Sequence, residues 1–281
     1  MRSFFRSLIF WLVGLTDSST RYFVSLSHHL LARKFSQVDQ ESYIELLSIL
    51  KPTSNFFPLK RFGCQGDGGY VLLDNIKPET VCFSLGIAQE ISFDIDIARN
   101  VSHVYMFDYS IASPPVSVSN ASFYPLKVVR EIKDPQIEID LNLMFERYSP
   151  HSPIILKVDI EGSEWDVFLD VSSRNIERCD QIIVEFHGIQ ILPLNSNFES
   201  YVFLLRRMLT SHTIVNTHIN NWDGYEVING IPVPNVLEVT FVKNSLLDRL
   251  NCNGLTLESL NFPNNPSKPE FLLYPFDRII G

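Results

Sequence analysis

Hydrophobic and polar positions repeat with two different periods along the chain from about residue 80 onward. Short apolar runs bounded by turn formers predict buried strands, whereas longer stretches with apolar residues every three or four positions predict helices. The predicted strands cover residues 80–85, 103–107, 122–128, 154–159, 181–186, 213–218 and 236–242. The predicted helices cover residues 39–50, 91–100, 137–148, 164–174 and 198–211.

Strands that alternate with helices predict parallel βαβ units with helices on both faces of one sheet. The last two strands differ, because residues 220–235 (NNWDGYEVINGIPVPN) are rich in turn formers and lack a helical period. An antiparallel terminal hairpin is therefore expected. We expect an α/β fold with a seven-stranded, mostly parallel sheet over residues 61–245. A helical extension (1–60) precedes it, and a tail (246–281) packs on it.

Composition limits the class of protein. The chain has 281 residues, 45% of them apolar, and a formal net charge of -9. A full core is possible, and the net charge argues against a general nucleic-acid binder, which would need a basic surface. The cysteines show no CxxC pair or zinc-ligand spacing, and we expect no disulfide framework. They are Cys64, Cys82, Cys179 and Cys252, of which Cys82 is expected to be a packed thiol.

The N-terminal residues allow three interpretations. Residues 8–15 (LIFWLVGL) form an apolar run too short for a bilayer span of about 20 residues. The run resembles the apolar core of a signal peptide but lacks a clear cleavage site. Residues 22–31 repeat apolar positions at helical spacing. A helix packed on the domain, membrane contact through residues 4–31 and a cleaved signal all remain open. We expect a cytoplasmic protein, with membrane association or an N-terminal signal or anchor left open.

A nucleoside site is indicated at the first two strands of the sheet. The first strand ends at Gly86 in FSLGIAQEISFD, where a glycine lets the backbone turn sharply next to a ligand. The phosphate-binding pattern GxGxxG is absent. Asp108 ends the second strand about 20 residues later, a position suited to a ribose diol. S-adenosylmethionine fits a nucleoside site without a phosphate cradle better than NAD or ATP does.

The segment RFGCQGDGGYVLLDN, residues 61–75, contains a DGG turn before a short strand. Gly68 and Gly69 permit positive φ, so the segment is either a structural hairpin or a cover over the cofactor. The candidate cofactor-binding residues are Ser84, Gly86, Glu90, Asp108, Tyr109 and Asp67.

Three later strands end in acidic, imidazole or amide side chains. The two-residue spacing of Asp159 with Glu161 and of Glu185 with His187 places each pair on one face. His218 and the asparagines after it end the sixth strand. Because the ends of parallel strands share one edge, these groups could meet in one cleft. They suit a general base or a divalent ion such as Mg²⁺, Mn²⁺ or Zn²⁺. Structural alternatives are open: Glu164 as an acid in a first helical turn and His218 as a satisfied buried histidine.

Several of these stretches together resemble a known family. They are RFGCQGDGGYVLLDN, FSLGIAQEISFD, VYMFDYS, LKVDIEGSEWDVF, IIVEFHGI, THINNW and VPNVLEVTFV, in order from residue 61 to about residue 243. They resemble the FkbM-like group of class I S-adenosylmethionine-dependent methyltransferases and a closely related domain family. The resemblance implies a Rossmann-like fold and methyl transfer, commonly to a hydroxyl. It also implies that Gly86 and Asp108 hold the cofactor, and that Asp159, Glu185 and His187 lie at the acceptor.

We therefore expect an O-methyltransferase that acts on a sugar or another small metabolite. His187 or His218 would be the base, with Asp159 and Glu185 orienting the acceptor. A divalent ion (Mg²⁺ or Mn²⁺) on Asp159, Glu185 and His187 is optional. The candidate acceptor contacts are Glu161, Asn220, Asn221 and Trp222.

Three other functions stay open. The glycine-poor GIAQE loop would also suit an inactive module that binds a nucleoside or a sugar. The acidic and histidine strand ends would suit a metal-dependent hydrolase. The N-terminal apolar run would suit a membrane-associated scaffold.

Overall fold

The computed structural model describes residues 40–53, 57–149, 151–249 and 260–271. Its main sheet has seven strands in the order β10-β13-β9-β8-β3-β4-β5. These strands are β3 (Val81–Leu85), β4 (His103–Phe107), β5 (Ala121–Tyr124), β8 (Ile154–Val158), β9 (Cys179–His187), β10 (His212–Ile219) and β13 (Val236–Lys243). Strands β5, β4, β3, β8 and β9 pair in parallel, and β13 pairs antiparallel with both β9 and β10. The predicted Rossmann-like α/β fold is confirmed.

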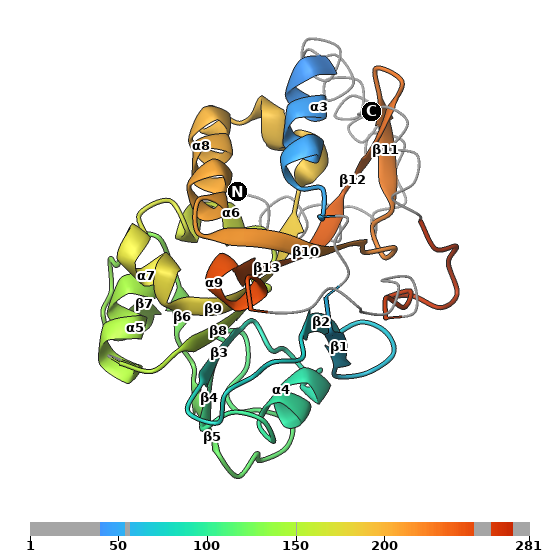
Figure 1. Ribbon diagram of the computed structural model, residues 1–281. Helices are drawn as coiled ribbons and strands as arrows, with labels where there is room; N and C mark the ends of the chain where they lie inside the picture. The colour runs from blue at the N-terminus through green and yellow to red at the C-terminus, as the bar shows by residue number, and fades with distance from the viewer. Residues whose placement is uncertain (1–39, 54–56, 150, 250–259, 272–281) are drawn as a thin grey trace, which may run out of the picture.

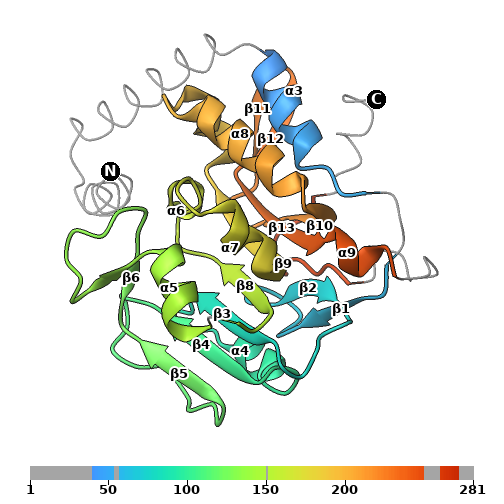
Figure 2. The same cartoon turned by 60° about the vertical axis from the view of Figure 1, so that its left-hand side comes forward.

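Helices cover both faces of this sheet (Figures 1 and 2). One face carries α3 (Gln40–Ile49), α5 (Leu141–Tyr148), α6 (Glu164–Val167), α7 (Ser173–Arg178), η1 (Ile189–Leu194) and α8 (Phe198–Leu209). The other face carries α4 (Ser92–Ile97) and the hairpin of β1 (Leu59–Phe62) and β2 (Tyr70–Leu73). The short helix α9 (Asn244–Leu247) follows β13.

The central strands are buried on both faces. Every residue of β3 and of β8 is buried, as expected for parallel strands between two layers. Alternate residues feed separate cores: Phe83 and Leu85 pack under the larger group of helices, whereas Cys82 packs under α4. The free thiols of Cys64, Cys82 and Cys179 agree with the absence of a disulfide framework among the described residues.

Two predicted elements are interrupted. The strand predicted over residues 122–128 ends at Tyr124, because Pro125 has no N–H to donate to a neighbouring strand. The chain then forms β6 (Lys127–Val128), which pairs with β7 (Glu138–Ile139) outside the main sheet. The helix predicted over residues 164–174 is split into α6 and α7. The second helix starts anew because the side chain of Ser172 accepts a hydrogen bond from the N–H of Asn175.

Two irregular regions of the sequence also have defined structures. The DGG segment is the turn of the β1–β2 hairpin, where Gly68 has φ +85°. The turn-rich stretch after β10 folds into a second hairpin of β11 (Tyr225–Ile228) and β12 (Ile231–Pro234). This small hairpin lies between β10 and β13 in the chain, so the predicted antiparallel pair is joined by a further two-stranded sheet.

The predictions for residues 4–31 fall outside the described residues. Within the described ranges, no helix is long and apolar enough to cross a membrane.

Candidate active site

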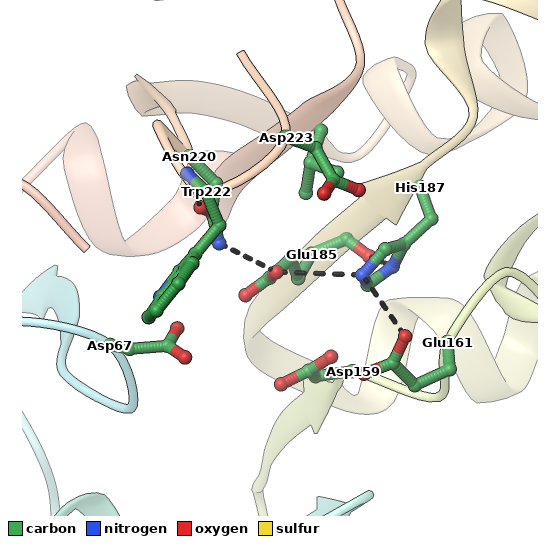
Figure 3. A pocket seen from close by; sticks show the side chains of 9 residues that line it. Asp67, Asp159, Glu161, Glu185, His187, Asn220, Trp222 and Asp223 are labelled. Atoms are coloured by element: carbon green, nitrogen blue, oxygen red, sulfur yellow. Dashed lines mark hydrogen bonds and ion pairs between the residues drawn. The ribbon is translucent and has the colours of Figure 1, made fainter. Parts of the chain in front are cut away.

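The carboxyl ends of β8, β9 and β10 meet at one edge of the sheet around a pocket, here called the acidic pocket (Figure 3). Its lining residues are Asp67, Asp159, Glu161, Glu185, His187, Asn220, Trp222, Asp223 and Val236. Its volume is about 230 Å³, below the roughly 300–1,000 Å³ of sites that enclose a whole drug-sized ligand. It can therefore hold the reacting end of a ligand rather than a complete nucleoside.

Two donors hold one carboxylate oxygen of Asp159. The hydroxyl of Tyr70 donates to Oδ2 of Asp159 at 2.9 Å, and Nζ of Lys157 lies 3.4 Å from the same oxygen. The ammonium of Lys157 also lies 5.3 Å from the centre of the Tyr70 ring. Both donors hold Oδ2, so Oδ1 is the oxygen that Asp159 can offer to a ligand.

The loop after β8 is organised by Glu164, whose side chain is fully buried. Its carboxylate accepts hydrogen bonds from the backbone N–H groups of Ile160 and Gly162 at 2.9–3.1 Å. Glu161 and Gly162 have positive φ values of +57° and +99°. This turn brings Glu164 back toward the end of β8. Glu164 therefore stabilises the loop as well as being an acidic residue in the first turn of α6.

His187 presents one ring nitrogen to the acidic pocket. Its Nδ1 lies 3.1 Å from Oε1 of Glu164 and 3.1 Å from the backbone oxygen of Glu185, so it donates to these acceptors. Its Nε2 lies 3.5 Å from Oε1 of Glu185 and 3.9 Å from Oε2 of Glu161. Burial lowers the pKa of His187, but the hydrogen bond and charge of Glu164, with nearby Asp159 and Glu161, raise it to about 9.

Glu185 contributes a buried carboxyl group, with 5% of the residue exposed. Its Oε1 accepts a hydrogen bond from Nδ2 of Asn220 at 2.9 Å, whereas its buried Oε2 has no hydrogen-bond partner among the described residues. Burial raises the pKa of Glu185 well above its usual value, and the charges of Asp159 and Glu238 raise it further. The raised pKa favours the protonated form of Glu185, which can donate a hydrogen bond.

His218 lies outside the acidic pocket. It is 4% exposed, and its Nδ1 and Nε2 lie 3.1 Å from Glu238 and 2.7 Å from Glu270, respectively. His218 lies within β10, opposite Glu238 of β13, whereas Asn220 follows the end of the strand and lines the pocket. With both ring nitrogens engaged, the histidine has no position from which to act as the predicted base.

The loop after β10 gives the pocket a wall that the C-terminal segment holds in place. Asn220 and Trp222, two of the residues predicted to contact the acceptor, line the pocket. Asn221 does not: it is fully buried and exchanges hydrogen bonds with the backbone of Asn265 at 2.9 and 2.7 Å. The ammonium of Lys268 donates to the backbone oxygen of Trp222 and lies 5.5 Å from its ring centre.

The loop after β3 lies directly against the end of β8. Gly86 has φ +72°, and a Cβ on it would lie 1.6 Å from the backbone oxygen of Asp159. Only glycine fits this close approach. The Oδ2 of Asp108 accepts hydrogen bonds from the N–H groups of Ile87 and Ala88 at 3.0 and 2.8 Å. Asp108, which the sequence predicts to bind a ribose, thus also holds the loop after β3.

The second oxygen of Asp108 accepts hydrogen bonds from the N–H and hydroxyl of Ser110 at 2.7 and 2.6 Å. Burial alone would raise the pKa of Asp108, but these hydrogen bonds and those from the loop lower it overall. The carboxylate therefore stays ionised. A ribose diol would have to share or replace the donors of Ser110.

The other predicted cofactor residues have different surroundings. Tyr109 is 65% exposed beside Asp108, as a ring available for stacking would be. Asp67 lines the acidic pocket. Ser84 is fully buried in β3, whereas Glu90 is exposed and accepts a hydrogen bond from the N–H of Ser92. The structure thus leaves Ser84 without direct access to a ligand.

The sequence profile of the methyltransferase FkbM domain matches residues 55–208, more than half of the chain. The chain belongs to the FkbM methyltransferase family. It is an S-adenosylmethionine-dependent methyltransferase, and the resemblance read from its sequence motifs is confirmed. None of the curated proteins matches the chain significantly.

Solved structures with low identity are also similar to this FkbM methyltransferase. A protein from Streptococcus mutans, described as a candidate methyltransferase in complex with SAH, is 10% identical, with 60% of this chain and 88% of that one covered and a TM-score of 0.33. The fibrillarin pre-rRNA processing protein of Methanococcus jannaschii is 12% identical over 61% and 70% of the two chains, with a TM-score of 0.35. An rRNA methylase from Streptococcus thermophilus is 12% identical over 60% and 89%, with a TM-score of 0.34.

The residues of this FkbM methyltransferase fit S-adenosylmethionine. The cofactor has no phosphate, which agrees with a loop that carries one glycine and no phosphate cradle. Its sulfonium and ammonium groups are positive, and five of the nine lining residues of the adjacent pocket are acidic. Gly86, Asp108 and Tyr109 would hold the nucleoside, and the acidic pocket would face the positive sulfonium.

Three residues of the FkbM methyltransferase site were not predicted as such. Lys157 could have been found from the sequence, because it is the one charged residue in the otherwise apolar run IILKV. A charge in a buried strand is rare unless it has a partner. Tyr70 stands in the DGGY motif but gives no sign of its distant partner Asp159. Asp223 lines the pocket from a loop without regular spacing, and no local signal identifies it.

Proposed function

We propose that this methyltransferase transfers the methyl group to a hydroxyl of a sugar or another small polyhydroxy metabolite. The observation that supports this is the meeting of Asp159, Glu185 and His187 at one sheet edge, with Nε2 of His187 facing the pocket. A hydroxyl acceptor needs alignment and removal of its proton. These three side chains offer both.

In the proposed reaction, His187 takes the proton of the acceptor hydroxyl. Glu164 holds Nδ1 of the imidazole, so the lone pair of a neutral His187 lies on Nε2. Bound S-adenosylmethionine supplies an electrophilic methyl group on its sulfonium. The acceptor oxygen forms the new C–O bond as the C–S bond breaks, and the released proton stays on Nε2. Asp159 orients the acceptor through its Oδ1, and protonated Glu185 donates to a second hydroxyl.

The surroundings favour a neutral acceptor. Besides Glu185, four acidic side chains line the pocket, so phosphate groups and nucleic acid would be repelled. Trp222 is 49% exposed at the pocket, where an indole face can pack on a sugar ring. We therefore place the acceptor among neutral sugars and related metabolites.

A divalent ion is a second candidate for activating the hydroxyl. Ligand atoms of Asp159, Glu164 and His187 all lie within 4.8 Å of one another, whereas the sequence predicted Asp159, Glu185 and His187. However, the oxygens of Glu164 already accept from Ile160, Gly162 and His187. An ion on Glu164 would break these bonds and open the loop. We therefore favour His187 as a base.

An acceptor screen tests the proposal. The protein is incubated with S-adenosylmethionine labelled in its methyl group and with neutral sugars, sugar phosphates and amines, each with EDTA or with Mg²⁺ or Mn²⁺. We expect an O-methyl product from a neutral hydroxyl compound in EDTA, located by mass spectrometry. Transfer only to nitrogen would refute O-methylation, and loss of transfer in EDTA would favour the ion.

A further inference from the structure

Lys157 lies inside the sheet between the loop after β3 and the acidic pocket. It is 5% exposed and is the only buried lysine among the described residues. A buried ammonium is costly unless hydrogen bonds and opposite charges compensate for the lost water. Its partners therefore show what the lysine stabilises.

The partners of Lys157 belong to two different parts of the site. Its Nζ donates to the backbone oxygen of Gly86 at 2.5 Å and lies 3.4 Å from that of Leu85, both at the loop after β3. The same nitrogen lies 3.4 Å from Oδ2 of Asp159, at the acidic pocket. One ammonium group therefore bridges the loop after β3, here called the cofactor loop, and the carboxylate proposed to orient the acceptor.

The backbone makes this bridge sensitive to small displacements. Gly86 approaches the backbone of Asp159 so closely that a Cβ would not fit between them. Methyl transfer requires reacting atoms to be held about 3–3.5 Å apart. A loop that loses its grip on Lys157 can move relative to Asp159 and lose this alignment.

The positive charge of Lys157 also reaches the acids around it. It lowers the pKa of Asp94, which burial raises, and it does the same for Glu185. Asp94 is a buried residue of α4. The lysine therefore balances negative charge from α4 as well as from the pocket.

The geometry points to Lys157 as a positioning residue that fixes the cofactor loop against Asp159 so that the donor methyl group faces the acceptor. The inference rests on binding of S-adenosylmethionine by the loop after β3, as in the proposed function, but not on the nature of the acceptor. Its test uses S-adenosylhomocysteine, so it is independent of the acceptor screen.

The test compares Lys157→Met with a matched control. Lys243→Met removes another ammonium that donates to a backbone oxygen, that of Glu177, far from the cofactor loop. Titration calorimetry measures the Kd for S-adenosylhomocysteine, hydrogen exchange follows residues 86–88, and thermal unfolding reports the fold.

We expect Lys157→Met to raise the Kd roughly 10-fold, as loss of a charge-assisted hydrogen bond in a binding loop would do, and to speed exchange at residues 86–88. Lys243→Met should leave the Kd within about twofold. Unchanged binding in a less stable Lys157→Met protein would overturn the proposal, as would an equal loss in Lys243→Met. If Lys157→Met does not fold, Lys157→Gln takes its place. If that variant also fails to fold, Lys157 serves the core alone and the positioning role is refuted.

Discussion

The hydroxyl of Tyr70 donates a hydrogen bond to Oδ2 of Asp159 at 2.9 Å, across 89 positions of the sequence. The DGGY motif and the acidic end of β8 are therefore two parts of one site. Tyr70 is buried, with its ring edge-on to Phe93 at 5.4 Å, so the phenol has little freedom to choose another partner. Burial and the charge of Asp159 raise the pKa of Tyr70 well above its usual value, which keeps the phenol protonated as a donor.

Replacing Tyr70 with Phe should loosen Asp159 without disrupting the hairpin. The ring and its packing remain, and only one hydrogen bond is lost, so we expect a loss of about 1 kcal/mol in stability. Turnover should fall more than binding of S-adenosylhomocysteine, because Asp159 serves the acceptor. Denaturant unfolding and initial rates measure the two effects. An equal loss of cofactor affinity and turnover would place Tyr70 on the cofactor side instead.

Replacing Asp159 with Asn should reduce methyl transfer by about 100-fold or more, while the fold is retained. The amide keeps the shape of the side chain but removes the charge that orients the acceptor and raises the pKa of His187. Rates with saturating methyl donor test this, with circular dichroism as the check on folding. Undiminished turnover would show that Asp159 has no part in the reaction.

The activity should depend on pH through His187. This histidine has a pKa of about 9, so at neutral pH most molecules carry a proton on it and cannot accept another. We expect kcat/KM for the acceptor to rise with pH, to reach half of its maximum near pH 9 and to level off above it. The His187→Asn variant should be slower by about 100-fold and lack this rise. A profile that is unchanged in the variant would assign the base to another group.

His218 should affect stability rather than chemistry. Burial lowers its pKa, but Glu238 and Glu270 raise it to about 9 in the folded protein, above the value of 6.5 for a free histidine. Its contribution is complete below about pH 6.5 and is lost as pH rises through about 9. The difference in Tm between wild type and His218→Asn should therefore be largest near pH 6 and shrink by pH 9. A difference that grows with pH would contradict the charged pair.

Gly86 should tolerate alanine less well than a glycine of similar backbone geometry. Gly230 has φ +85° and open space around it, whereas Gly86 has φ +72° and faces the backbone oxygen of Asp159. Gly230→Ala should cost about 1 kcal/mol for the left-handed backbone alone. Gly86→Ala should cost several times more and weaken binding of S-adenosylhomocysteine. Equal losses in Tm for the two variants would remove the steric argument.

The sequence was sufficient to predict the strand ends but not the contacts between distant segments. Asp159, Glu185 and His187 could be placed together because alternate residues share a face and parallel strands share an edge. Alternation along a strand does not show how far a side chain lies from the end of the strand. His218 was therefore a candidate base, although it is buried and its Nε2 contacts Glu270.

Glu164 and Asn221 show a second limit of the sequence. Glu164 reaches His187 only because Glu161 and Gly162 adopt positive φ, a backbone choice that spacing does not reveal. Asn221 is bound by Asn265, a loop residue 44 positions away. Such contacts depend on tertiary packing and leave no periodic signal in the chain.

The wall formed by Asn220, Trp222 and Asp223 lies beyond residue 208, where the match to the family domain ends. One wall of the pocket is thus encoded outside the matched domain, whereas Asp159, Glu185 and His187 are encoded within it. Substitutions in this short loop would reshape the pocket without changing the three side chains that carry the proposed chemistry.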